Sequence, residues 1–187
     1  MTDRWRCFVA VPLGDELSLA LRTLVYDWRD EPDFDGLHWT DPGSWHVTLA
    51  FLGSVEVDRI DGIVSALREV AAAHRPMRLA TGGLGAFPSA GRARVAWYGV
   101  ADPDGRLAAL ARDVRRATGV AGSEFRGHVT LARARREPVS VRELVDRASP
   151  EGTLSVDHVA LMRSHLGRGP ARYEGVADVD LGVTSRV

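Results

Sequence analysis

The pentapeptide His-Val-Thr-Leu-Ala occurs twice in this chain of 187 residues, at 46–50 and again at 128–132. Counted from composition, such a match arises by chance in about one chain of this size in fifty, so the repeat is informative. A segment with apolar residues at helical spacing precedes each copy, 15–28 before the first and 104–118 before the second. The pattern predicts a pair of βα units that are related by internal duplication and face each other.

Each copy has the character of a β-strand, in which successive side chains point to opposite faces. His46 and Thr48 therefore share one face of the first strand, and His128 and Thr130 share one face of the second. The valine and leucine of each copy point the other way, toward a core. Two such strands facing each other would place two imidazoles and two hydroxyls around a small cavity.

This set of side chains suits cleavage of a phosphodiester. The reaction needs a base for the attacking oxygen and an acid for the leaving oxygen, and histidine titrates near neutrality, so one imidazole can serve as each. Threonine hydroxyls can donate hydrogen bonds to the non-bridging oxygens, where negative charge is held in the transition state. No metal ion is required, and a strained five-membered cyclic phosphate is a suitable substrate.

The composition excludes several other chemistries. All 24 cationic side chains are arginines, so the chain has no lysine nucleophile and no Gly-Lys phosphate loop. It has no asparagine or glutamine, so a base would have to be recognised by backbone groups, arginines or aromatic stacking. The net charge is −1, which argues against non-specific coating of nucleic acid and favours contact with an end or a single nucleotide.

A single His-x-Thr on a strand is more often an ordinary surface pair, and the identical context of the two copies raises the weight of the functional interpretation. A metal site would need carboxylates or further histidines at ligand spacing, and HExxH and CxxC are absent. The remaining histidines are scattered, and we expect structural or surface roles for them: His38, His74, His158 and His165. We therefore expect neither a metal nor a cofactor.

The other segments predict further strands and helices of one domain over 1–187, with no linker long enough to separate domains. Gly119 is expected to cap the second of the two helices described above, and 154–163 reads as one closing strand. A lone cysteine, Cys7, favours a reducing compartment. Without an apolar signal core or a long apolar run, we expect a cytoplasmic protein with no membrane span.

The two motifs resemble the paired HxTx motifs of the 2H phosphoesterase superfamily, and nearly the whole chain resembles its RNA 2′,3′-cyclic phosphodiesterases, also called 2′-5′ RNA ligases. Five segments carry the resemblance: Arg6–Ala10, 45–53 around the first motif, Gly82–Pro88, Phe125–Arg133 around the second motif, and a closing segment from Arg163 to Tyr173. The paired motifs are specific to the superfamily, and the central and closing segments indicate the subgroup.

The resemblance implies the α+β class and a bilobal 2H phosphoesterase fold, in which two antiparallel sheets with flanking helices surround a central cleft. It implies hydrolysis of RNA 2′,3′-cyclic phosphate ends to 2′-phosphomonoesters, with His46 as general acid and His128 as general base. Thr48 and Thr130 would hold the phosphate. The reverse chemistry would form a 2′-5′ linkage without ATP. We expect a monomer whose partner is an RNA end or a related nucleotide.

Arg133 matches an arginine that the family associates with the active site, so we include it as a phosphate-binding candidate. Simple alternation, however, places Arg133 on the face opposite His128. Either the strand ends or bulges before this residue, or Arg133 is a neighbouring salt-bridge residue. Ala50 and Gly127 depart from the family pattern, which commonly has lysine and proline there. These departures bear on nucleotide contacts rather than on the chemistry.

Several points stay open at this level. Four aromatic residues could stack on a base, although each is more often a core residue: Phe8, Trp39, Trp45 and Phe87. Arg126, Arg135 and Arg136 form the most basic stretch, which suits an RNA tail but is also typical of a solvated face. The alternative functions are a non-catalytic binder of RNA ends or nucleotides, a phosphodiesterase acting on a small nucleotide such as ADP-ribose cyclic phosphate and, third, a metallohydrolase.

Overall fold

The structure is a computed structural model that describes residues 3–121, 124–165 and 172–182. Four helices are present in these ranges: α1 (Asp15–Trp28), α2 (Ile60–Ala73), α3 (Arg106–Thr118) and α4 (Arg142–Val145). The strands are β1 (Arg4–Pro12), β2 (Leu37–Trp39), β3 (His46–Glu56), β4 (Met77–Phe87), β5 (Val95–Val100), β6 (His128–Ala134), β7 (Gly152–Val156), β8 (His158–His165) and β9 (Arg172–Asp180).

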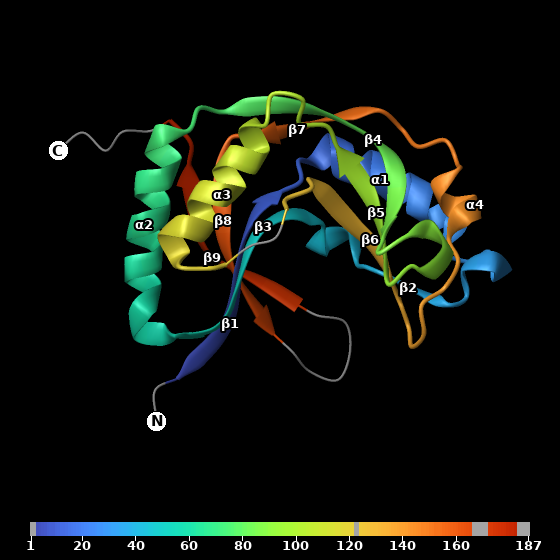
Figure 1. Ribbon diagram of the computed structural model, residues 1–187, viewed down its shortest axis with the longest axis horizontal. Helices are drawn as coiled ribbons and strands as arrows, with labels where there is room; N and C mark the ends of the chain where they lie inside the picture. Colours follow the sequence, from blue (N-terminus) through green and yellow to red (C-terminus); the bar gives the residue numbers. More distant parts are fainter. Residues whose placement is uncertain (1–2, 122–123, 166–171, 183–187) are drawn as a thin grey trace.

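The strands form one curled antiparallel sheet in the order β7-β4-β5-β6-β3-β1-β8-β9, with β2 paired to β6 (Figure 1). Across the described residues, β3 and β6 pair at one position, Val47 with Val129. The two antiparallel sheets that the resemblance implied are therefore two half-sheets that meet at this pair. We call β3, β1, β8 and β9 the first half-sheet, and β6, β5, β4, β7 and β2 the second half-sheet. The predicted α+β class is confirmed.

The helices cover the two half-sheets in pairs. Helices α2 and α3 pack against each other, with α3 on β3 and α2 on β9, whereas α1 contacts β7 and α4 contacts β4 (Figure 1). Helix α3 buries Leu107, Leu110, Ala111 and Val114, as its apolar stripe predicts. Gly119 ends it with φ +70° and donates its N–H to the Arg115 and Arg116 carbonyls, which confirms the predicted cap.

Each lobe is built from both halves of the chain. Helix α1 precedes β3 in sequence but lies on the second half-sheet, and α3 precedes β6 but lies on the first. The helix before each histidine strand thus crosses to the opposite lobe. This exchange ties the lobes together over a hydrophobic core that includes Leu21, Leu49, Leu107 and Leu131.

The prediction of one strand over 154–163 is wrong. The chain bends at Asp157, so that β7 ends the second half-sheet and β8 enters the first. At the bend, the Asp157 carbonyl accepts a hydrogen bond from the backbone N–H of Leu181. The apolar alternation shifts from even to odd positions across the bend, since Leu154 and Val156 are buried before it and Val159 after it. This change of phase is the signal that a strand boundary lies there.

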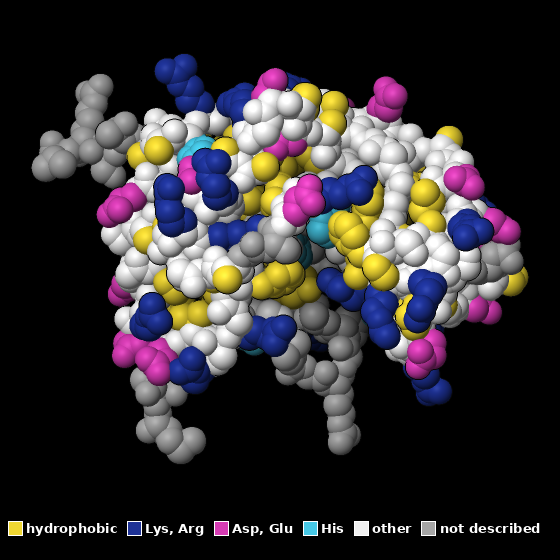
Figure 2. Space-filling model, in the orientation of Figure 1, with side chains coloured by type: hydrophobic (Ala, Val, Ile, Leu, Met, Phe, Trp, Pro, Cys, Tyr) yellow, Lys and Arg dark blue, Asp and Glu magenta, His cyan; other side chains and the backbone are white. Residues whose placement is uncertain are grey.

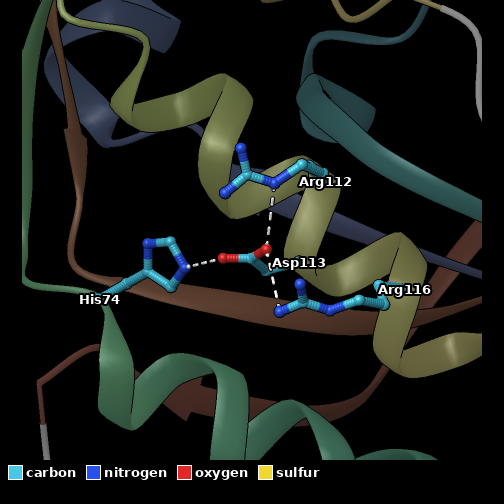
Figure 3. A network of polar contacts seen from close by, with 4 residues as sticks. All are labelled: His74, Arg112, Asp113 and Arg116. Carbon is cyan, nitrogen blue, oxygen red and sulfur yellow. Dashed lines mark hydrogen bonds and ion pairs between the residues drawn. The ribbon is translucent and has the colours of Figure 1, made fainter.

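A polar network fixes the packing of α2 against α3 (Figure 3). Asp113 Oδ2 accepts a hydrogen bond of 3.0 Å from His74 Nε2 at the end of α2, and Oδ1 lies 3.2 Å from Arg112 Nε and 3.2 Å from Arg116 Nη2. Burial alone would raise the pKa of Asp113, but the hydrogen bonds from Arg112 and His74 and the charges of the two arginines hold it below the ordinary value. In the described part of the chain, no helix is long and apolar enough to cross a membrane.

Candidate active site

The two pentapeptides lie side by side at the middle of the sheet. His46 and His128 are the first residues of β3 and β6, next to the Val47–Val129 pair that joins the half-sheets. Both valines are fully buried, and both histidines are partly accessible on the opposite face. The alternation that the sequence predicted for these strands is therefore present.

A cleft of about 1150 Å³ opens over this junction. Its lining includes every site residue that the sequence singled out: His46, Thr48, His128, Thr130 and Arg133. Figure 2 shows histidine side chains near the centre of this face, set among hydrophobic side chains and arginines. Pockets for single small ligands are commonly 300–1,000 Å³, roughly, so this cleft has room beyond one nucleotide.

The two imidazoles are oriented in the same way. Nδ1 of His46 lies 2.7 Å from the Ser44 carbonyl oxygen, and Nδ1 of His128 lies 2.7 Å from the Arg126 carbonyl oxygen. A carbonyl only accepts hydrogen bonds, so each Nδ1 carries a proton. Nε2 is then the atom at which each ring can take or give a proton. This arrangement leaves two equivalent nitrogens for acid–base chemistry in the cleft.

Burial lowers the pKa of both histidines. For His46 the hydrogen bond to the Ser44 carbonyl works against burial, while the positive charges of Arg133 and of a protonated His128 lower the pKa further. For His128 the Arg126 carbonyl opposes burial, and the charges of Arg133 and Arg126 add to it. Both imidazoles are therefore mainly neutral in the free protein at neutral pH.

Arg133 reaches the cleft because β6 bulges at Leu131. In the ladder with β5, Ala132 pairs with Ala96 but Thr130 pairs with Trp97, so Leu131 is the extra residue. Leu131 and Ala132 are both buried, so the alternation of buried and accessible side chains shifts by one position and Arg133 faces the cleft. Of the alternatives that the sequence left open, the bulge is the one observed.

Strand β3 carries an equivalent bulge at Leu49. Val9 of β1 pairs with Ala50 and Ala10 pairs with Thr48, which leaves Leu49 without a partner. Phe51 thereby turns toward the cleft, where its side chain is 63% exposed although it is apolar. Sequence reasoning missed Phe51 because alternation assigns it to the core. A signal was available in the repeat: Phe51 lies five residues after His46, just as Arg133 lies five residues after His128, so the two positions are equivalent.

Aromatic rings stand beside each imidazole. The Phe8 and Tyr173 ring centroids lie 4.8 and 5.3 Å from that of His46, and those of Phe87 and Trp97 lie 5.0 and 6.3 Å from that of His128. Apolar rings exclude water from one side of each histidine, which accounts for the desolvation that lowers its pKa.

The four aromatic candidates of the sequence divide between cleft and core. Phe8 and Phe87 line the cleft, and Trp45 lines it with only 6% of its surface exposed. Trp39 instead packs edge-on against Phe34 and is not among the lining residues, so its proposed stacking role is not supported. Tyr173 was not singled out as a site residue. It ends the closing segment, of which 166–171 lie outside the described residues.

The cleft is basic although the chain is not. Arg6, Arg115, Arg126 and Arg133 line it, and among the described lining residues Glu124 is the one acidic side chain. Arg126 lies 4.4 Å above the Trp97 ring, next to His128. Arg135 instead binds the Leu37 carbonyl, and Arg136 is exposed outside the lining. Positive charge is thus concentrated where a phosphate would lie.

Within the ranges that the structure describes, no group of three His, Cys, Asp or Glu side chains could hold a metal ion. The lining does contain potential metal ligands, namely the two imidazoles, the Cys7 thiol and the Glu124 carboxylate, but they do not form such a group.

Known proteins show a consistent likeness to this chain. The model of the 2′-5′ RNA ligase superfamily matches residues 20–168. The RNA 2′,3′-cyclic phosphodiesterase of Archaeoglobus fulgidus is 31% identical over 88% of this chain and 94% of its own length. The enzyme of the same name from Aquifex aeolicus is 31% identical over 77% of this chain and 81% of its own.

The fold has also been seen in a solved structure. Escherichia coli LigT complexed with NADP+ superposes with a TM-score of 0.80, covering 97% of this chain and all of that one at 22% identity. The family match spans both histidine strands. The chain belongs to the 2′-5′ RNA ligase superfamily.

Proposed function

We propose that this protein is an enzyme that hydrolyses 2′,3′-cyclic phosphate ends of RNA to 2′-phosphomonoesters. The observation that carries the proposal is the pair of imidazoles in one cleft, each with Nδ1 held by a carbonyl and Nε2 available. The names of relatives such as the Archaeoglobus fulgidus RNA 2′,3′-cyclic phosphodiesterase support the same activity.

In the proposed reaction His128 is the general base. Its Nε2 takes a proton from a water molecule whose oxygen attacks the phosphorus of the cyclic phosphate. The low pKa of His128 keeps Nε2 unprotonated and ready to accept. The assignment of the base to this histidine follows the family resemblance.

His46 is the general acid. Its Nε2–H protonates the 3′ oxygen as the bond from phosphorus to that oxygen breaks, which leaves a 2′-phosphate and a 3′-hydroxyl. His46 has to be protonated at this stage although its pKa is lowered in the free protein. The negative charge of a bound phosphodiester opposes that shift, so substrate binding itself favours the protonated acid.

Thr48, Thr130 and Arg133 hold the phosphate in this scheme. The two hydroxyls flank the histidines on the same strand faces and can donate to the non-bridging oxygens. The Arg133 guanidinium can donate to a phosphate oxygen with a charge-assisted bond. The bulge at Leu131, which turns Arg133 into the cleft, supports this role.

The decisive experiment is product analysis. An oligonucleotide with a 2′,3′-cyclic phosphate end is incubated with the protein in EDTA, and the product is identified by its phosphate position. A 2′-phosphate supports the proposal. A 3′-phosphate, or activity that depends on added metal, contradicts the mechanism. Tight binding without any product would favour the non-catalytic binder, and faster turnover of ADP-ribose cyclic phosphate would assign a small nucleotide as substrate.

The same site can serve 2′-5′ ligation. A 5′-hydroxyl in place of water would attack the cyclic phosphate, with the same proton transfers and without ATP. The room in the cleft beyond a single nucleotide supports this second activity. The test is to incubate the protein with one RNA strand that ends in a 2′,3′-cyclic phosphate and a second strand that begins with a 5′-hydroxyl. The absence of a 2′-5′ linked product would limit the enzyme to hydrolysis.

We also propose that residues 1–187 form one domain of two pseudo-symmetric lobes. The elements β1, α1 and β3 correspond in order to β5, α3 and β6, with β2 as an additional strand before β3, and each set contains a histidine strand with a bulge three residues after the histidine. Because one chain forms the whole cleft, we propose a monomer. The single free cysteine, Cys7, supports a reducing compartment such as the cytoplasm.

A further inference from the structure

The relative position of the two histidine strands needs more support than their own pairing gives. Along the described residues, β3 and β6 share one residue pair. Acid–base catalysis depends on placement of the two imidazoles and the phosphate-binding groups to within fractions of an ångström. Contacts from outside the two strands must therefore contribute to their register.

Thr40 makes such contacts with both strands. It lies between β2 and β3, and its Oγ1 is 2.8 Å from the Thr130 carbonyl and 2.9 Å from the Leu131 carbonyl. The same hydroxyl accepts a hydrogen bond of 2.8 Å from Nε1 of Trp45, the residue before His46. One hydroxyl thus accepts a hydrogen bond from the residue before His46 and donates to carbonyls of the His128 strand.

The carbonyls that Thr40 binds lie at the bulge. Leu131 is the unpaired residue of β6, and its carbonyl also accepts the Thr40 backbone N–H at 2.8 Å. A bulged residue leaves the regular ladder, so its buried polar groups need other partners. For the Leu131 carbonyl, which lies between Thr130 and Arg133 in the sequence, these partners are the hydroxyl and the backbone N–H of Thr40. Loss of the hydroxyl would weaken the bulge that directs Arg133 into the cleft.

The first half-sheet has an equivalent contact at its own bulge. Nε of Arg115, on α3, donates to the Leu49 carbonyl at 2.9 Å. Both bulged leucines therefore have their carbonyls bound by a side chain from a segment that belongs to neither strand of the local pair. This correspondence indicates that the contact at Thr40 is part of how the site is held.

We propose that Thr40 is a positioning residue that sets Arg133, and the register of the two histidine motifs, by binding the bulge at Leu131 and the Trp45 indole together. The proposal rests on the proposed function for its kinetic readout. In this role the Thr40 hydroxyl does not contact the reacting atoms.

The test is a double-mutant cycle between Thr40→Val and Arg133→Met. Thr40→Val keeps the shape and the backbone N–H but removes the hydroxyl, and we expect kcat/KM to fall about 10-fold in the wild-type background. In the Arg133→Met background the same change should cost less than about 2-fold, because the residue through which Thr40 acts is already gone. Thr40→Ser should restore most of the activity.

A matched control is Thr23→Val, because the Thr23 hydroxyl binds the Leu19 carbonyl within α1. It should leave kcat/KM unchanged. The affinity for adenosine 2′-phosphate, measured by calorimetry on the same proteins, should show the same pattern. Equal kcat/KM for Thr40→Val and wild type, or full multiplication of the two losses, would overturn the inference. An inactive wild type would instead refute the proposed function, and the affinity cycle would still decide the role of Thr40.

Discussion

Replacement of Asp113 by asparagine tests whether the network in Figure 3 holds α3 in place. This helix lies on β3 and carries Arg115, whose Nε binds the Leu49 carbonyl in the His46 strand. The substitution Asp113→Asn keeps the size of the side chain but removes its negative charge. We expect a loss of stability at neutral pH, mainly because the contact of Asp113 with His74 is weakened.

The exposure of each partner decides the magnitude. The Arg112 and Arg116 side chains are 70% and 77% exposed, so their ion pairs with Asp113 contribute at most about 1 kcal/mol each. His74 and Asp113 are only 15% and 16% exposed, and a hydrogen bond to a charged group in such a setting contributes about 1.5–3 kcal/mol. Because asparagine can still accept one hydrogen bond, Asp113→Asn should lower the free energy of unfolding by about 2 kcal/mol.

The effect should depend on pH in one direction. The pKa of Asp113 is lowered in the folded protein, so its stabilisation is present above the unfolded pKa and is lost as pH falls through the folded pKa. The difference between wild type and variant should therefore be full at neutral pH and shrink below about pH 4.

Urea unfolding followed by tryptophan fluorescence measures this difference, since the chain has five tryptophans. Arg112→Ala is the matched control and should cost under about 1 kcal/mol. A difference for Asp113→Asn of less than about 0.5 kcal/mol at neutral pH, or one that grows toward acid pH, would refute the reasoning.

Three further predictions concern the cleft. His46→Ala and His128→Ala should each lower kcat about 10²–10⁴-fold in single-turnover assays, and a variant with wild-type rate would exclude its histidine from proton transfer. Since both histidine pKa values lie below the ordinary 6.5, the pH optimum of kcat/KM should fall below that value, and Arg133→Met should move it upward by removing a positive charge. Gly85→Ala should cost about 1–3 kcal/mol in urea unfolding, because its Cβ would overlap the buried Trp97 ring beside His128.

The repeated pentapeptide was sufficient to predict the imidazole and hydroxyl groups of the cleft. Local alternation placed His46 and Thr48 together, and likewise His128 and Thr130, because that property depends only on neighbouring residues in an extended chain. The amphipathic segments that became α1 and α3 were predicted for the same reason.

Alternation failed at the two bulges. Arg133 belongs to the cleft because β6 has an extra residue, Leu131, opposite β5, and Phe51 belongs to it because β3 has an extra residue, Leu49, opposite β1. Each bulge is a mismatch between two paired strands, and the side chains that bind the bulged carbonyls, Thr40 and Arg115, are distant in sequence. Neither the mismatch between strands nor these distant contacts can be predicted from a local sequence pattern.

The sequence by itself determined which side chains are the candidates for the proposed chemistry and that they occur as a matched pair, since composition and strand period are local properties. The tertiary structure alone decided that the pair meets at Val47 and Val129, that α1 and α3 each cross to the opposite lobe, and that bulges turn Arg133 and Phe51 into one cleft. These features depend on contacts between segments far apart in the chain, and such contacts become defined only when the two half-sheets pack together.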